Sequence, residues 1–456
     1  MISQKFKKIK VLALLAGPGS GSKVFQSFID GHPQVLMIPG YILMYFYPHW
    51  KKHLKNHNNW TKIINHFLKL HPSIIDAKNL KGGDYLFNLG LNKKQSVKIN
   101  KKKFIKKLKY YLKGEEINSK NFFLAIHLAY EYCLGKNLKA KKILFYHMHV
   151  CWYIKYLYND FQDSKTITMI RELKSNIPNR IPSFEKPNEM HLNKTDAIFF
   201  KTRSYKNTIF EDFFSLDYLK RFQNKDHRVI RHEDLMIKKK EILKNFCKFV
   251  GISFKNTLLK STINNYIWNY KFNKKTTLKN GVASHIVDYD KKNFFNYEIF
   301  WINSLSKNFN KHYSYKNQIL SFSIFNKILS FFFIILPSKK ELSLLFNFFT
   351  FKFIKIYFES LYEEAFKIKL KQYEKNAFYS HKWSNKNFPF KFINFLISKI
   401  NKKKNIFWII VYILLKILMF IFIPAVIVYE YIFRIMICFR VYFRDIRGLR
   451  FFPKKI

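Results

Sequence analysis

Four short apolar stretches in the first half of the chain have the length and composition of buried parallel strands. They cover residues 11–16, 143–147, 166–170 and 228–231. Helical patterns lie between them, one from about residue 22, one over about 150–161 and one over about 234–250. Gly251 stands where the third helix should end. Strands that alternate with helices predict a three-layer α/β domain with a parallel sheet.

Two other regions depart from this alternation. Residues 41–140 are aromatic and mostly helical in pattern, as a helical insertion that binds a substrate would be. From about residue 316 the chain becomes apolar and basic, with an apolar run over 406–429 that only Lys416 and Pro424 interrupt. We therefore predict a first domain over 1–315 and a mostly helical, apolar and basic C-terminal extension over 316–456.

The run over 406–429 is long enough to cross a bilayer. Lysines at 402–404 precede it and five arginines at 434–450 follow it, and the positive-inside rule places both flanks on the cytoplasmic side. A re-entrant hairpin at Pro424, or a helix that lies in the interface of an anionic membrane, satisfies both flanks. This interpretation predicts a protein on the cytoplasmic face of the membrane. The alternative is a buried core helix of a soluble subdomain.

The charge balance favours an anionic partner. Lys and Arg total 82 against 29 acids, for a net charge of +53, which suits a nucleotide, an acidic glycan or a membrane surface. A chain rich throughout in Lys, Asn, Ile and Phe acquires much of this charge from composition alone. Only 11 of the basic residues are arginines, in two groups over 171–231 and 434–450, and arginine grips phosphate bidentately. No nucleic-acid-binding motif accompanies the charge, so nucleic acid is not an expected partner.

Cysteine usage and the start of the chain indicate a reduced, cytoplasmic protein. Four cysteines occur without a CxxC pair, which gives neither a zinc site nor a disulfide framework. The opening MISQKFKKIKVLALLAG is basic and then apolar, as in a signal peptide. Its apolar part is short and continues directly into a glycine loop, so we interpret it as a buried strand.

That glycine loop, AGPGSGSKVFQ, connects the first predicted strand to the first predicted helix. A loop in this position presents backbone N–H groups to an anion, and the helix dipole adds to the attraction. The candidate binding residues are Pro18, Gly19, Ser20, Gly21, Ser22, Lys23 and Val24. A Walker A loop requires GxxxxGK[ST], whereas here the lysine comes one place late and valine follows it. An ordinary ATPase or GTPase is therefore not expected.

Three segments resemble the sulfotransferases that use 3′-phosphoadenosine 5′-phosphosulfate (PAPS). GPGSGSKVFQSFIDGHPQV resembles their 5′-phosphosulfate loop and the helix behind it. TITMIRELKSNIPN resembles the strand that ends in their 3′-phosphate arginine, and HRVIRHEDLMIKKKEILKNFCKFVGISF resembles a later strand, Glu-Asp-Leu and helix. The resemblance covers residues 1 to about 315 and implies a P-loop-like sulfotransferase domain with PAPS as co-substrate and no metal.

The resemblance also implies roles for residues near the nucleotide. Arg171 would hold the 3′-phosphate, with Asn179 in the place of a serine that helps it. Arg171 also ends a predicted strand, where open α/β sheets bind ligands, although a structural salt bridge is the alternative. Trp268 would cover the base. The family has Lys or Arg where this chain has Gly19, and Lys23 is the candidate to replace that cation.

A base must take the proton of the acceptor hydroxyl. His147 and His149 lie two residues apart and so on one face of a continuing strand. His149 stands 22 residues before Arg171, about the spacing of the cytosolic sulfotransferases, so it is the first candidate and His147 the second. An ordinary strand-end histidine is the alternative for both.

These observations predict transfer of a sulfuryl group from PAPS to a hydroxyl acceptor, a glycan or a lipid-linked saccharide. One rival is a P-loop kinase of a small molecule or sugar, which needs a magnesium ligand after the loop and an aspartate at the end of a strand. The other is a non-catalytic membrane scaffold, which the missing loop cation favours.

Overall fold

The computed structural model describes most of the first 315 residues and the last five. The described ranges are 2–17, 19–40, 42–79, 88–92, 94–148, 151–180, 219–268, 278–279, 282–283, 294–315 and 452–456, with isolated positions elsewhere. The predicted apolar segment over 406–429 lies almost entirely outside them. Within these ranges, no helix combines the length and the apolar character that crossing a bilayer requires. The membrane-associated extension thus stays a prediction.

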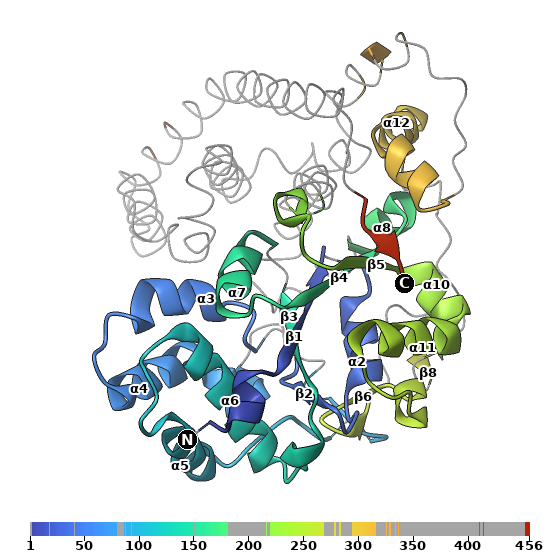
Figure 1. The fold of residues 1–456 in the computed structure, drawn as a ribbon. Helices are drawn as coiled ribbons and strands as arrows, with labels where there is room; N and C mark the ends of the chain where they lie inside the picture. The colour runs from blue at the N-terminus through green and yellow to red at the C-terminus, as the bar shows by residue number, and fades with distance from the viewer. Residues whose placement is uncertain are drawn as a thin grey trace.

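A six-stranded, wholly parallel sheet forms the centre of the fold (Figure 1). In spatial order its strands are β10 (Lys454–Lys455), β5 (His227–Arg231), β4 (Lys165–Ile170), β1 (Lys10–Ala16), β3 (Ile143–Met148) and β2 (Val35–Met37). Helices α2 (Ser22–Ile29) and α11 (Lys239–Val250) cover one face, and α6 (Ser119–Cys133) and α7 (Ile154–Asp160) cover the other. Because both faces are covered, the central strand β1 is a continuous apolar run from Val11 to Ala16. The predicted three-layer α/β class is confirmed.

The sheet also contains two strands that the sequence patterns did not indicate. β2 is three residues long and β10 only two, so neither displays a readable hydrophobic pattern. β10 comes from the end of the chain, where the Ile456 amide donates to the Val229 carbonyl at 3.0 Å. The Tyr313 hydroxyl donates to the Pro453 carbonyl at 3.2 Å. The C-terminus is thereby fixed to the edge of the sheet beside β5.

The helix predicted over 234–250 is two helices in the structure. α10 (His232–Ile237) ends at Lys238, whose φ of −115° and ψ of 38° leave the helical region, and α11 then begins. Gly251 closes α11 with a φ of +78°, as its place in the sequence predicted. α10 starts directly at the end of β5, and its first residue, His232, lies beside the glycine loop.

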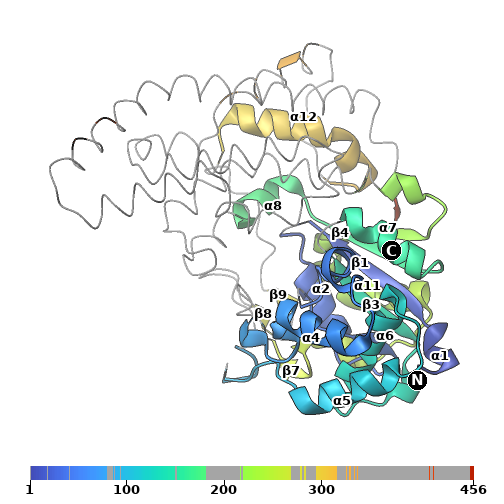
Figure 2. The same ribbon diagram turned by 90° about the vertical axis from the view of Figure 1, so that its left-hand side faces the viewer.

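The insertion is helical, as predicted. It comprises α3 (Phe46–His49), which continues as the π-helix η1 (Trp50–Leu54), then α4 (Trp60–Leu70), α5 (Lys101–Leu112) and α6. Asparagine side chains accept a hydrogen bond from a first-turn amide of α4, α5 and α6, which fixes where these helices begin. Figure 2 shows these helices grouped beside the sheet, while α12 (Asn296–His312) lies next to α8 (Leu173–Arg180).

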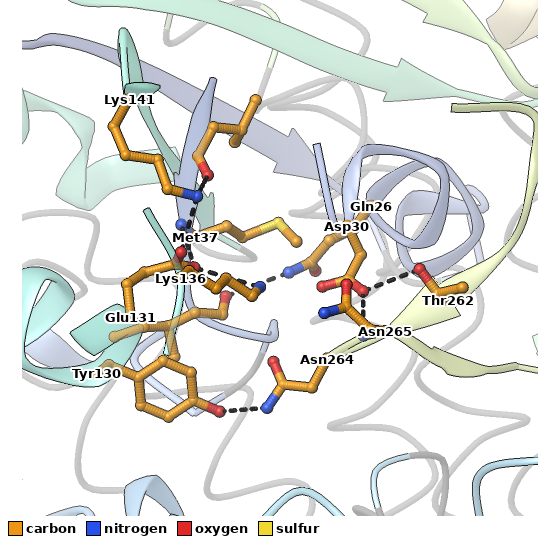
Figure 3. Close-up of polar contacts among 12 residues, drawn as sticks. Gln26, Asp30, Met37, Tyr130, Glu131, Lys136, Lys141, Thr262, Asn264 and Asn265 are labelled. Atoms are coloured by element: carbon orange, nitrogen blue, oxygen red, sulfur yellow. Dashed lines mark hydrogen bonds and ion pairs between the residues drawn. The ribbon is translucent and has the colours of Figure 1, made fainter. Parts of the chain in front are cut away.

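A buried polar network attaches the insertion and a small hairpin to the sheet (Figure 3). The hairpin consists of β6 (Thr262–Ile263) and β7 (Tyr266–Ile267). Asp30 accepts from the Thr262 hydroxyl and from the Asn265 amide, both at 2.9 Å. Asn264 donates to the Tyr130 hydroxyl at 2.9 Å. The hairpin is thus bound to the end of α2 by two partly buried hydrogen bonds and to α6 by a buried one.

Histidines line the contact between η1 and α4. His49 Nδ1 lies 2.7 Å from His71 Nε2, and His57 Nε2 lies 2.9 Å from His66 Nδ1. His71 Nδ1 lies 3.0 Å from the Ile42 carbonyl, which can only accept, so His71 must donate there and accept from His49. The sequence has no Asp or Glu between Asp30 and Asp76 to neutralise an added proton.

We expect acid to destabilise the fold through its buried histidines. Burial lowers the pKa of His71 and of His127 to about 4, from an ordinary value of 6.5. Because the folded pKa is depressed, the unfolded chain binds more protons below pH 6.5. The contribution of each buried histidine to the free energy of unfolding is therefore fully present above pH 6.5 and is lost toward pH 4. At pH 5 the loss is about 2 kcal/mol for each histidine. Urea unfolding at pH 7.5 and at pH 5 measures the loss.

His71→Gln should flatten this pH dependence relative to the wild type, since the substituted side chain does not titrate. Equal free energies of unfolding at the two pH values in the wild type would show that these histidines are not buried as neutral rings.

Candidate functional site

The glycine loop between β1 and α2 has a backbone that only glycine adopts easily. Gly19 has a φ of +78° and Gly21 a φ of +86°, both in the left-handed region. The Ser20 hydroxyl donates to the Gly17 carbonyl at 2.7 Å, so in this structure it closes the loop on itself. No side chain caps α2, and its first-turn amides adjoin the loop. The loop therefore has the strand–loop–helix form of an anion cradle.

His232, the first residue of α10, packs against this loop. A Cβ added to Gly21 would lie 2.2 Å from His232 Nδ1, so the glycine is required by space as well as by its φ. His232 Nδ1 is buried and has no hydrogen-bond partner among the described residues. Burial, and secondarily the positive charge of Arg171, lower the pKa of His232 to about 3. Burial thus favours the neutral form of the ring.

Sequence reasoning missed His232. The HEDL segment was interpreted only as the transition from a strand to a helix. The available signal was its position, since residues that directly follow parallel strands meet at one edge of the sheet. β5 is two strands from β1, and its following residue reaches the loop because α10 begins there without a linker.

Arg171 follows β4, the strand between β1 and β5. Its Nη1 lies 3.5 Å from the Gly19 carbonyl, at the limit of a hydrogen bond. The neighbouring Glu233 accepts from the Glu172 amide and from the Tyr315 hydroxyl, both at 3.0 Å. Burial raises the pKa of Glu233, and these hydrogen bonds oppose the rise. The Arg171 guanidinium thus lies beside Gly19, the loop position at which the resemblance to PAPS-dependent sulfotransferases predicts a lysine or arginine.

His147 lies near the end of β3 and is only 3% exposed. Its Nδ1 lies 2.7 Å from Oε1 of Gln26, a residue in the second turn of α2. The histidine is therefore on the face of the sheet that α2 covers, behind the loop. His149, the first candidate base, lies outside the described residues, and its role stays a prediction.

The remaining candidates divide into three groups. Lys23 is half-buried in the first turn of α2, while Ser22 and Val24 are buried beside it. Trp268 is 2% exposed and belongs to the apolar core, and its amide donates to the Ser261 carbonyl at 3.0 Å. Pro18 lies outside the described residues, as does the side chain of Asn179, whose backbone belongs to α8.

The structure thus brings the loop, Arg171 and His232 together, while His147 contacts Gln26 in the helix that follows the loop. Over the described ranges, no three histidine, cysteine, aspartate or glutamate side chains converge as metal ligands would.

The chain matches no family model and no curated protein. Among solved structures it is similar to the sulfotransferase domain from the curacin biosynthetic pathway, with 15% identity and a TM-score of 0.31, over 56% of this chain and 77% of that one. It is also similar to the sulfotransferase domain from the Synechococcus PCC 7002 olefin synthase, with 16% identity and a TM-score of 0.32, over 55% and 76%. Both neighbours carry the name of the family that the sequence motifs resemble. At these scores the likeness transfers no activity to this chain.

Proposed function

We propose that this protein is a sulfotransferase that moves a sulfuryl group from PAPS to a hydroxyl, with a saccharide as the acceptor. The observation that carries the proposal is the glycine loop with the Arg171 guanidinium beside it. Two left-handed glycines open the backbone between β1 and α2, and the Arg171 guanidinium lies 3.5 Å from the Gly19 carbonyl. An anion in this loop would meet backbone N–H groups, the positive end of a helix and a bidentate cation together.

The chemistry of sulfuryl transfer suits this set of groups. The acceptor oxygen forms a bond to sulfur while the bond from sulfur to the 5′-phosphate oxygen breaks, leaving adenosine 3′,5′-bisphosphate. As in phosphoryl transfer, catalysis is mainly positioning and stabilisation of charge on the equatorial and leaving oxygens. Arg171, beside the Gly19 carbonyl, and Lys23, in the first turn of α2, are the cations that would stabilise this charge. The acceptor proton would pass to a histidine at the end of β3, His149 or His147.

The kinase alternative is weaker because the groups that bind magnesium are not where it needs them. Val24, which takes the place after the lysine, is 1% exposed and has no oxygen to offer. Of the described inner strands, β4 is followed by Arg171 and β5 ends in Arg231, so neither places an aspartate beside the loop. A sulfotransferase needs neither group.

The acceptor and the location of the protein rest on sequence alone. We infer a saccharide acceptor, on a glycan or a lipid, because we expect the helical insertion to bind the acceptor and the C-terminal extension suits an anionic membrane. The charge of +53 supports that surface and the nucleotide alike. These are proposals about the cytoplasmic face of a membrane, where a lipid-linked saccharide would be within reach.

The Arg171→Ala substitution tests the nucleotide site. We expect adenosine 3′,5′-bisphosphate to bind the wild type and the variant to bind at least tenfold more weakly, since a charge-assisted phosphate contact contributes roughly 1.5–3 kcal/mol. Isothermal titration calorimetry measures both affinities. Arg221→Ala is the matched control, because Arg221 is exposed on a 3-10 turn before β5 and should leave the affinity unchanged.

A folded wild type that does not bind this nucleotide would overturn the sulfotransferase proposal. Tighter binding of ATP with magnesium would favour the kinase instead, and binding of neither nucleotide would favour a scaffold.

A further inference from the structure

Helix α5 has a buried face and a basic face. Phe104, Leu108 and Leu112 recur every fourth residue and belong to the apolar core, where α5 packs on α6. Figures 1 and 2 both show α5 on the outside of α6, away from the sheet. The side of α5 opposite these apolar residues therefore faces solvent.

That solvent-facing side carries a row of four exposed lysines, here called the lysine row: Lys102, Lys106, Lys109 and Lys113. The first three belong to α5, and the last directly follows it. Their spacing of four, three and four residues keeps them on one side of the helix. At 1.5 Å per residue the row is about 16 Å long. Lys101 and Lys103, also exposed, widen it at the start of the helix.

The lysine row has no ion-pair partner among the described residues. The sequence contains no Asp or Glu from residue 85 to residue 114. Glu115 and Glu116 come next, and both are engaged elsewhere. Glu115 pairs with Lys7 at 2.8 Å, and Glu116 accepts from the side-chain amide of Asn118 at 3.1 Å. The described part of the protein thus supplies no counter-charge to the row.

This arrangement costs stability. Like charges three or four residues apart on one side of a helix repel, and the lysine row contains three such pairs in succession. The first turn of α5 holds three lysines and no acid, although the positive end of a helix dipole favours acids there. The lysine-rich helix α11, by contrast, has Glu241 in its first turn. A bound anionic surface would relieve both repulsions in α5.

We propose that the lysine row is a docking surface for a bilayer that contains anionic phospholipids. The headgroup layer offers mobile negative charges that gather beneath clustered lysines. Lysine suits such a layer because it is a hydrated point charge on a flexible stem, whereas arginine grips a single phosphate in a fixed geometry. α5 contains no arginine. Tyr110, one turn after Lys106 and 57% exposed, has the apolar ring and polar tip of a residue at headgroup level.

The contact is peripheral, because the apolar side of α5 is buried in the core and cannot enter the bilayer. Charge alone holds the helix to the headgroups, so salt weakens the contact. The lysine row is separate from the C-terminal extension on which the proposed membrane location rests. The inference deepens that location and depends on neither the nucleotide nor the transfer reaction.

Two glutamine variants of equal net charge test the lysine row. The first combines Lys102→Gln, Lys106→Gln, Lys109→Gln and Lys113→Gln. The second is the matched control and replaces four exposed lysines in and beside α11: Lys238, Lys240, Lys244 and Lys248. Cosedimentation of the full chain with vesicles of phosphatidylglycerol and phosphatidylcholine measures binding. We expect the first variant to bind at least roughly tenfold more weakly than the wild type, and the control to lose less than about threefold.

Equal losses in the two glutamine variants would overturn the proposal, because binding would then follow net charge alone. A first variant that loses affinity for heparin or single-stranded RNA but keeps its affinity for vesicles would also overturn it, in favour of a soluble polyanion. Thermal unfolding checks the fold, since removal of like-charge repulsion should leave the first variant at least as stable as the wild type.

A third variant, with arginine at the four positions of the lysine row, keeps the charge and should keep the affinity for vesicles. Loss of vesicle binding in this variant, when folded, would contradict docking by charge. Failure of the wild type to bind adenosine 3′,5′-bisphosphate would overturn the proposed transfer reaction and leave this inference intact, so the two failures are distinguishable.

Discussion

The Gly21→Ala protein is expected to bind adenosine 3′,5′-bisphosphate at least a hundredfold more weakly than the wild type, or not at all. Two costs act together at this position. The φ of +86° belongs to the left-handed region, where a Cβ costs roughly 1–2 kcal/mol. The added Cβ would also stand 2.2 Å from His232 Nδ1 and 2.8 Å from its Cε1, so either the ring or the loop must move. Calorimetric titration with the nucleotide measures the effect.

Gly251→Ala provides the matched control for Gly21→Ala. Gly251 has a φ of +78°, yet a Cβ there would meet nothing within 4 Å. This variant should lose roughly 1 kcal/mol of stability and keep its nucleotide affinity. The double variant Gly21→Ala/His232→Ala removes the clash and should regain part of the affinity. Unchanged binding in folded Gly21→Ala would show that the loop does not hold the nucleotide.

The sequence patterns located the layers of the fold because burial imposes a strong signal on long elements. Strands β1, β3, β4 and β5 are five to seven residues long with mostly buried side chains, and each begins and ends within one residue of its predicted bounds. β2 and β10 escaped because two or three residues carry no periodicity, and the Lys-Lys of β10 has the composition of a solvated tail. Their pairing depends on tertiary contacts that the local sequence does not encode.

The candidate site was predictable to the extent that it depends on chain order. A glycine loop between a strand and a helix, and an arginine at the end of the strand paired to β1, follow from position in a parallel sheet. The contacts of His232 and Gln26 do not, since they depend on where a helix begins and on which way an amide points. Gln26 in particular looks like one more polar residue of an amphipathic helix. Its hydrogen bonds to the Ile38 carbonyl and to His147, both more than ten residues away, appear only in the structure.

The buried ion pair between Glu131 and Lys141 underlies that arrangement (Figure 3). Lys141 Nζ lies 2.7 Å from Glu131 Oε2, with the two side chains 2% and 0% exposed. Lys141 also donates to the Val35 carbonyl at 2.5 Å, and the Met37 amide lies 3.5 Å from Glu131 Oε1. Both ends of β2 are thus bound to the pair, directly before the Ile38 carbonyl that orients Gln26. Burial lowers the pKa of Lys141, and the attraction of Glu131 opposes that shift.

Glu131→Gln should therefore destabilise the protein by about 3–5 kcal/mol, because it leaves the Lys141 ammonium buried without its counter-charge. Thermal and urea unfolding at pH 7.5 measure the loss. The double variant Glu131→Leu/Lys141→Met removes both charges and should recover most of the stability, since a well-packed apolar pair can replace a buried ion pair at little cost. Lys98→Met, which breaks an exposed pair with Asp76 at 3.6 Å, should cost less than about 1 kcal/mol. A loss in Glu131→Gln no larger than in Lys98→Met would mean that Lys141 reaches water. The end of β2 would then not be held by this pair, and the register of Ile38 with Gln26 would need another support.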